Sequence, residues 1–300
     1  MSGMGIRDEV RGFLASRRAR ISPEQAGIAV SHGVRKRRVP GLRREEVAML
    51  AGVSVDYYVR LERGTLTGVS DHVLDAVARA LQLDAAEHAH LRDLVRAGSM
   101  NSAERTRTVT SRVRPALQQT LDAIATPAWI RNGRSDFLAA NHLGRALFSP
   151  MLETIVGTPN TARFVFLHQQ AQDFYGDWGA IAAEMVAVLR AEAGRRPHDK
   201  KLTDLVGELA TRSDYFRARW AAHDVREFRG GLKTLHHPGV GALELSWESL
   251  RLPADEGLTM SIYSAEPGSK TAERLQLLGS WASTLSAAAG SGDRRRNCGS

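Results

Sequence analysis

Apolar residues recur every three or four positions through the first 98 residues of the chain, as they do in helices that bury one face. This spacing predicts helices over 7–20, 43–51, 55–63, about 71–81 and 84–97. Gly52 stands where the end of a helix needs left-handed backbone, and Ser54 stands where a hydroxyl can cap the next helix. Tyr58 and Leu61, three residues apart, are expected to face inward, and Ala48 is small enough to let two helices approach closely.

The hydrophobic pattern changes after residue 112. A helix over 115–125 precedes two short strands that meet at a turn formed by Asn132 and Gly133 and end near Asn141. Helical spacing returns over 142–148, 164–170, 177–193, 199–212 and 213–223, and alternation then predicts strands over 231–236, 242–250 and 258–264 before a last helix at 271–286. The fold class is therefore multi-domain: an all-α five-helix domain followed by an α+β domain with a five-stranded antiparallel sheet.

The domain boundaries follow from these patterns and from a polar stretch without apolar periodicity. We expect one domain over 1–98, a linker over 99–111, a second domain over 112–286 and a disordered tail over 287–300. The single cysteine, Cys298, lies in that tail and cannot form a disulfide within the chain. No long apolar window and no signal-peptide core occur, so we expect a cytoplasmic protein without a membrane span.

The segment 41–64 has the layout of a DNA-reading helix-turn-helix, in which the second helix enters the major groove. An ordinary helical hairpin is the alternative interpretation. Charge favours DNA, since residues 1–45 hold eleven Arg or Lys against four Asp or Glu in a chain of net charge +8. Part of this excess is the run Arg35–Arg38, which precedes Pro40 and is expected to be a loop or an arm.

Several stretches of the chain resemble the MmyB-like transcription regulators, a branch of the xenobiotic-response-element helix-turn-helix family. They are RRVPGLRREEVAMLAGVSVDYYVRLERG, VLDAVARALQLDAAEHAHLRDLV, PALQQTLDAIATPAWIRN, NTARFVF, LVGELATRSDYFRARWAAHDV, HHPGVGALELSWESLRLP and LQLLGSWA. The resemblance implies a PAS-like ligand-binding second domain, and a fatty-acid-like molecule is one occupant described for the family.

The resemblance also places residues on the DNA-facing side, and each has a chemical role there. The candidate DNA-binding residues are Arg43, Arg44, Ser54, Val55, Asp56, Tyr57 and Arg60. Arg60 can donate two hydrogen bonds to a guanine, and Val55 can contact a thymine methyl group. Asp56 either accepts from a cytosine or favours the helix N-terminus. Arg43 and Arg44 can bind phosphate, or one of them pairs with Glu62 as in the family.

The aromatic residues of the second domain suggest a pocket, although a simple apolar core is the alternative. The candidate ligand-binding residues are Trp129, Asn141, Leu147, Phe164, Phe166, Trp178, Trp220, Leu245 and Tyr263. Asn141 is the expected polar anchor. Ala140 stands where the family usually has a tryptophan, so the resemblance does not fix the identity of the ligand.

No enzyme motif is present, and neither a catalytic site nor a cofactor is expected beyond a possible bound fatty acid or similar molecule. His223, His236 and His237 are the best metal candidates, but turn and capping roles fit them better, and no metal is expected. The sequence therefore predicts a homodimeric transcriptional regulator that binds an operator and responds to an apolar or amphipathic ligand. In the alternative, the second domain serves only dimerisation or a protein partner, and an enzyme or a haem or flavin sensor is a further rival.

Overall fold

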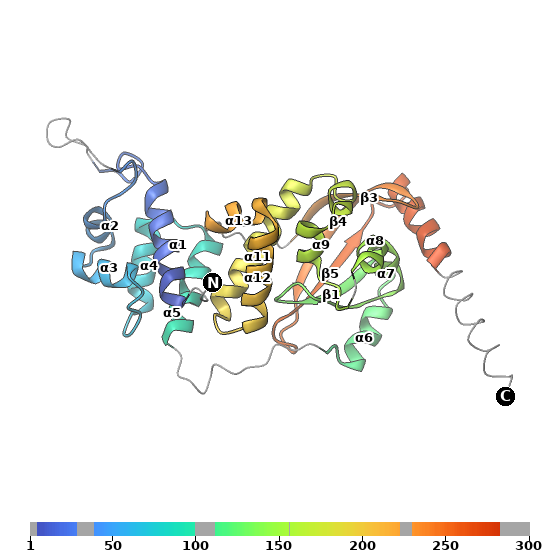
Figure 1. Ribbon diagram of the computed structural model, residues 1–300, viewed down its shortest axis with the longest axis horizontal. Coiled ribbons are helices and arrows are strands. Elements are labelled where there is room, and N and C mark those ends of the chain that lie inside the picture. Colours follow the sequence, from blue (N-terminus) through green and yellow to red (C-terminus); the bar gives the residue numbers. More distant parts are fainter. Residues whose placement is uncertain (1–4, 29–38, 100–111, 156, 223–229, 283–300) are drawn as a thin grey trace. The chain divides into compact units, whose positions relative to one another are not determined.

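A computed structural model describes residues 5–28, 39–99, 112–155, 157–222 and 230–282 (Figure 1). The chain divides into two compact units, which are described separately. The first unit combines Met1–Arg107 with Val186–Glu227, and the second combines Thr108–Met185 with Phe228–Ser300. Two helices that the sequence assigns to the second domain, over 199–212 and 213–223, therefore lie in the first unit.

Five helices form the N-terminal part of the first unit, and the sequence predicts all five. They are α1 (Ile6–Arg20), α2 (Arg44–Ala51), α3 (Val55–Glu62), α4 (Asp71–Ala80) and α5 (Ala85–Ser99). Their apolar faces form one core that includes Phe13, Val47, Tyr58 and Leu91. The helical spacing of these residues in the sequence reflects this shared interior.

The turn between α2 and α3 has the local chemistry that the sequence predicts. Gly52 adopts a left-handed conformation with φ of 66°, which a glycine tolerates without a steric penalty. The Ser54 hydroxyl accepts a hydrogen bond from the backbone N–H of Tyr57 at 3.1 Å and caps α3. Ala48 is completely buried, and its carbonyl accepts a hydrogen bond from Val53, which fixes the path of the turn.

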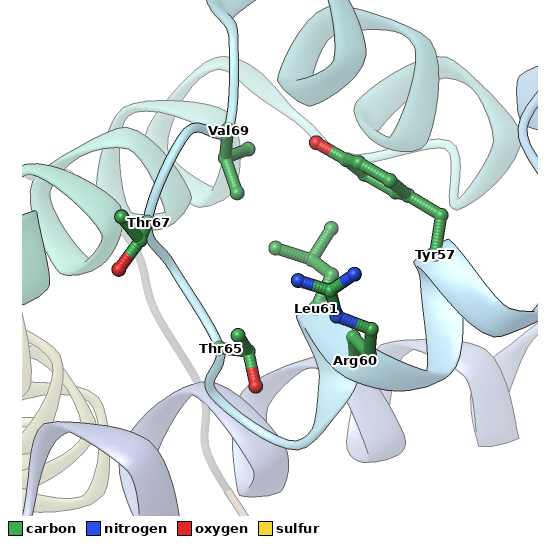
Figure 2. Close-up of a pocket in the computed structure, with 6 residues that line it drawn as sticks. All are labelled: Tyr57, Arg60, Leu61, Thr65, Thr67 and Val69. Atoms are coloured by element: carbon green, nitrogen blue, oxygen red, sulfur yellow. The ribbon is translucent and has the colours of Figure 1, made fainter.

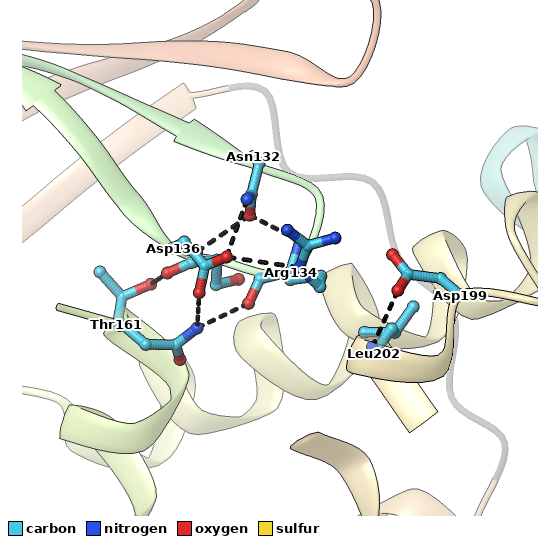
Figure 3. Close-up of polar contacts among 8 residues, drawn as sticks. Asn132, Arg134, Asp136, Thr161, Asp199 and Leu202 are labelled. Carbon is cyan, nitrogen blue, oxygen red and sulfur yellow. Dashed lines mark hydrogen bonds and ion pairs between the residues drawn. The ribbon is translucent and has the colours of Figure 1, made fainter. Parts of the chain in front are cut away.

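Three further helices lie wholly or partly in the first unit: α11 (Trp178–Arg195), α12 (Lys200–Arg212) and α13 (Asp214–Ala221). α12 and α13 lie in the first unit, while α11 belongs to the second unit up to Met185 and to the first from Val186. Asp199 caps α12 by accepting from the backbone N–H of Leu202 at 3.2 Å (Figure 3).

The second unit is built on a five-stranded antiparallel sheet, which confirms the predicted fold class. Its strands are β1 (Ala128–Asn132), β2 (Phe137–Ala140), β3 (Gly230–His237), β4 (Gly241–Arg251) and β5 (Leu258–Ser264), in the spatial order β2-β1-β5-β4-β3. The remaining helices are α6 (Pro115–Asp122), α7 (His142–Leu147), α8 (Ser149–Thr154), α9 (Thr161–Leu167) and α10 (Gln170–Phe174). A helix also covers 270–282, within the predicted range 271–286.

The sheet buries apolar side chains on both of its faces. On one face, Leu117 and Leu121 of α6 pack on Ile130, Met260 and their neighbours. The cross-strand pairs Trp129 with Ser261, Trp247 with Tyr263 and Lys233 with Leu245 share the opposite face, because paired and alternate residues of a sheet point the same way. This second face carries the aromatic side chains.

The turn between β1 and β2 is held by a polar network (Figure 3). The Asn132 side chain accepts hydrogen bonds from the backbone N–H groups of Arg134 and Asp136 at 2.9 and 3.0 Å. Asp136 in turn accepts from Asn160, which also caps α9. The network fixes the start of α9 against the end of the first hairpin.

None of the helices in the described residues is long and apolar enough to cross a membrane.

Replacing Ala48 by leucine tests the close approach of α2 and α3. The site is completely buried, so three extra carbons must force the two helices apart, and we expect the free energy of unfolding to fall by about 1–3 kcal/mol. Urea unfolding followed by circular dichroism measures the loss. The matched control is Met49→Leu at the next position, which is 63% exposed and should leave stability almost unchanged. Equal stability of the two variants would contradict the tight packing at Ala48.

Candidate functional site

The outer face of α3 presents the side chains that were expected to face DNA. Val55 is 45% exposed, and Asp56 and Arg60 are exposed as well, while Tyr57 is half-buried. On the opposite face Tyr58 and Leu61 are buried in the core, as predicted. The helix therefore presents Val55, Asp56 and Arg60 outward, and Ser54 caps its N-terminus.

A shallow hollow lies beside this row, between α3 and the loop that follows it (Figure 2). Tyr57, Arg60 and Leu61 line it from α3, and Thr65, Thr67 and Val69 line it from the loop. In Figure 2 the Arg60 guanidinium extends into the space between the Tyr57 ring and the loop. The hollow therefore brings the Arg60 guanidinium, the Tyr57 ring and the hydroxyl groups of the loop together beside the exposed face of α3.

A buried carboxylate holds α3 in place from behind. Glu62 is 1% exposed and accepts from Arg44 at 3.2 and 3.1 Å and from Arg18 at 3.1 Å. The hydrogen bond and charge of Glu62 raise the pKa of Arg44. Arg43 and Arg44 were both considered as partners of Glu62, and the structure shows the pair with Arg44. The Arg44 side chain is 47% exposed, although its guanidinium bonds to a buried carboxylate.

Arg43 lies at the N-cap of α2, and its side chain contacts Glu45 at 3.3 Å. Its backbone N–H donates to the carboxylate of Glu46, which completes the cap. The basic run Arg35–Arg38 lies outside the described residues.

In the second unit, a cluster of aromatic rings covers one face of the sheet. Trp129 stacks on Phe137 with ring centroids 4.8 Å apart, and Phe148 packs against both. Phe148 also contacts Tyr263 and links the sheet to the helices. Of the candidate ligand-binding residues, Trp129, Leu147, Phe164, Phe166, Leu245 and Tyr263 are all buried in this unit.

Two buried polar groups lie within this aromatic cluster. The indole N–H of Trp129 is buried and reaches no acceptor of good geometry in the described part of the chain, although the Tyr263 hydroxyl lies beside it. Burial raises the pKa of Tyr263, so this hydroxyl remains protonated. The indole N–H of Trp129 and the Tyr263 hydroxyl therefore lie beside each other inside the apolar cluster.

Asn141 has a different role from the one expected. Its side-chain oxygen accepts from Ala128 and Gly144, and its side-chain nitrogen donates to the carbonyls of Ile124 and Thr126. An amide side chain has two donors and one oxygen with two lone pairs, so these four bonds use its full capacity. Asn141 therefore ties α7 to β1 and to the segment before it, and these four bonds do not favour its expected role as the polar anchor of a ligand.

Two other candidates make contacts of their own. Trp220 belongs to the first unit, where its ring stacks on Phe216 and lies 4.1 Å below the Arg190 guanidinium. Trp178 is half-buried at the start of α11 and donates its indole N–H to the carbonyl of Val165 at 2.9 Å. Both residues are candidates because they are aromatic and fall in the second domain of the sequence, and each packs within the chain through these contacts.

The sequence did not reveal a partly buried ion pair at the sheet. The Lys233 ammonium contacts the carboxylate oxygens of Glu184 at 3.1 and 2.9 Å and lies 3.6 Å from the centre of the Trp247 ring. Burial lowers the pKa of Lys233, and Glu184 opposes that shift. The alternation that buries Leu235 also places Lys233 inward, since the two residues are two positions apart in one strand.

His237 makes turn contacts, in line with the sequence analysis. Its Nδ1 accepts from the backbone N–H of Gly239 at 3.1 Å, so Nε2 carries the proton that faces the carbonyl of Ala146. Burial lowers its pKa. His223 lies outside the described residues, and within those residues no group of three His, Cys, Asp or Glu side chains is placed to hold a metal ion.

Comparison with known families gives the class of protein, a DNA-binding transcription regulator with a ligand-binding second domain. Residues 12–91 match a helix-turn-helix domain, and residues 113–278 match the MmyB-like transcription regulator ligand binding domain. The chain belongs to the MmyB-like transcription regulator family. No curated protein matches the chain significantly.

Replacing Glu62 by glutamine tests whether the buried carboxylate holds α3. The change leaves Arg18 and Arg44 facing a neutral amide in a buried site, and we expect a loss of about 3 kcal/mol in the free energy of unfolding. Chemical unfolding at neutral pH measures this loss. Glu45→Gln removes an exposed carboxylate of α2 and should cost almost nothing. A Glu62 variant as stable as the Glu45 variant would show that the ion pairs are not needed.

Proposed function

We propose that this regulator reads a specific operator through α3 and that a small apolar or amphipathic ligand in its second unit modulates that binding. The observation that supports operator reading most directly is the division of α3 into two faces. Tyr58, Leu61 and Glu62 fix the helix inside the domain, and Val55 and Arg60 remain exposed. A helix fixed from behind can present its outer face to base edges without rearrangement.

The chemistry of the exposed residues suits direct readout. The Arg60 guanidinium can donate to the O6 and N7 acceptors of a guanine, and Val55 can contact a thymine methyl group. Asp56, in the first turn, either accepts from a cytosine amino group or favours the helix N-terminus. The Tyr57 hydroxyl, at the rim of the hollow in Figure 2, is suited to a phosphate oxygen.

A homodimer on a palindromic or pseudo-palindromic operator is part of the proposal. Isolated helix-turn-helix units bind one half-site, and a two-fold dimer gains specificity by binding two half-sites separated by about 34 Å, one turn of DNA.

The ligand part of the proposal rests on the aromatic face of the sheet. An amphipathic molecule would place its tail among rings such as Phe148 and Phe164, and its polar end at the Trp129 N–H and the Tyr263 hydroxyl. Binding changes operator affinity only if the ligand has different affinities for the DNA-competent and incompetent states.

Arg60→Ala tests operator reading. A gel-shift titration on DNA from upstream of the protein's own gene, at a stated salt concentration, should show specific affinity reduced roughly 5- to 100-fold, the effect of losing one bidentate contact. Arg63→Ala is the matched control, because Arg63 is exposed at the C-cap of the same helix. It should cause a smaller loss that is equal for specific and unrelated DNA. Equal losses for the two variants on all DNA would mean that α3 makes only phosphate contacts.

Trp129→Phe tests the polar end of the ligand site. The change keeps an aromatic ring but removes the buried N–H, so binding of decanoate, measured by calorimetry, should weaken about tenfold. Trp281→Phe changes a tryptophan that is 51% exposed and should bind as the parent protein does. If decanoate binds equally to both variants, its polar end lies elsewhere. If neither decanoate nor decanol binds and mass spectrometry of the denatured protein finds no co-purified molecule, the second unit is better explained as a dimerisation or partner module.

A further inference from the structure

Lys233 is the one lysine among the described residues that is not exposed. Lys200, Lys201 and Lys270 are exposed, whereas the Lys233 side chain is only 13% exposed. Its ammonium contacts the carboxylate oxygens of Glu184 at 3.1 and 2.9 Å, and both residues belong to the second unit. Operator reading does not need this amine, and the ligand contacts proposed above do not use it.

The path of the chain before α11 places Glu184 over β3. The backbone N–H of Gly176 donates to the carbonyl of Thr234 in β3 at 2.9 Å. This approach requires a glycine, because a Cβ at position 176 would lie 2.9 Å from the Thr234 side chain. α11 begins two residues later and carries Glu184 to Lys233. The ion pair is therefore held by the fold of the second unit.

The amine of Lys233 lies among apolar side chains. Leu245 pairs with Lys233 across the strands, and Trp247 is two positions further along β4, so both lie on the same face of the sheet, and both are buried. The ammonium lies 3.6 Å from the centre of the Trp247 ring. Burial, the largest effect, lowers the pKa of Lys233, Glu184 opposes this shift, and the charge of Arg131 adds to it. A desolvated lysine of this kind gives up its proton more easily and then becomes a nucleophile.

An amine beside a carboxylate can form an imine with an aldehyde. Glu184 takes one proton from the Lys233 ammonium, and the neutral amine forms a bond to the carbonyl carbon. The carbonyl oxygen then receives two protons, one returned by Glu184 and one from the amine nitrogen, and it leaves as water when the C–O bond breaks. The ammonium and the aldehyde thus become a protonated imine and one molecule of water, and no oxidant or reductant is needed.

The surroundings of Lys233 suit the protonated imine as well as they suit the ammonium. The imine keeps one positive charge on the same nitrogen, so it can still pair with Glu184 and face the Trp247 ring. Apolar neighbours keep water away from the imine and slow its hydrolysis. The side chains of Lys233 and Glu184 are 13% and 16% exposed, which leaves part of the pair open to an entering carbonyl group.

We propose that Lys233 is a covalent binding site for an aldehyde with an apolar tail, held as a reversible protonated imine, and that Glu184 transfers the protons. The proposal deepens the proposed function and rests on it for the apolar or amphipathic nature of the ligand. At Lys233 a carbonyl head group is preferred to a carboxylate, because a carboxylate would place a second negative charge beside Glu184.

Reductive trapping of the full-length protein with decanal and sodium cyanoborohydride tests the proposal. The hydride reduces the imine once it has formed, so each reaction leaves a decyl group on a lysine that peptide mapping by mass spectrometry locates. We expect Lys233 to be labelled at decanal concentrations at least about tenfold lower than Lys200, Lys201 and Lys270 require, because those exposed lysines lack the carboxylate and the apolar surroundings.

Three variants show whether the chemistry belongs to this pair. Lys233→Arg keeps a positive charge beside Glu184 but has no amine that forms an imine, so the selective labelling should be lost. Lys270→Arg is the matched control at an exposed lysine and should leave labelling of Lys233 unchanged. Glu184→Gln keeps the size of the side chain but cannot carry the proton, and it should slow labelling of Lys233 about a hundredfold without affecting Lys270.

Calorimetry with decanol separates failure of this proposal from failure of the proposed function, since decanol has the same tail and no carbonyl group. If decanol binds and decanal labels all lysines equally, the covalent site is wrong and the ligand-binding sheet stands. Selective labelling of Lys233 without decanol binding supports the covalent site and contradicts a noncovalent ligand. Labelling of Glu184→Gln at the parent rate overturns the role of Glu184. If Lys233→Arg does not fold, as judged by circular dichroism, the peptide map of the parent protein and the Glu184→Gln rate decide.

Discussion

The buried carboxylate of Glu62 is the interaction on which the DNA-reading surface depends. It lies on α3 and receives Arg18 from α1 and Arg44 from α2, so one group fixes the mutual positions of three helices. A carboxylate buried without such partners would be strongly unfavourable, and this makes the arrangement specific as well as stable. These ion pairs hold α3 in a fixed position, and the exposed residues from Val55 to Arg60 are therefore held in fixed positions as well.

The second unit combines a sheet that is apolar on both faces with a small number of buried polar groups. One face is closed by α6, and the other holds the aromatic cluster. The Asn141 side chain makes four hydrogen bonds to backbone groups of this unit, so its role here is structural. The Trp129 N–H and the Tyr263 hydroxyl are the polar groups of the aromatic face to which the proposed function assigns the polar end of a ligand.

The boundary between the units does not coincide with the boundary between the family domains. α12, α13 and the second half of α11 lie within the ligand-binding match but pack in the first unit, with Arg190 completely buried there. The unit that contains the helix-turn-helix therefore includes residues 186–227, which lie far beyond the helix-turn-helix in the sequence.

Local sequence determined the elements of this protein, and tertiary structure decided which of its polar residues are free to act. The positions of Gly52 and Ser54 specified the turn, helical spacing placed Tyr58 and Leu61 inside, and alternation predicted the strands, because backbone preference and one-sided burial are encoded locally. The sequence also revealed the family and the exposed face of α3. It did not reveal that Asn141 is saturated, that Trp220 lies in the first unit or that Lys233 pairs with Glu184 across 49 positions. These facts depend on which side chains from distant segments come into contact. The sequence gives the type of each hydrogen-bonding residue, but it does not show whether the folded chain already supplies that residue's partners.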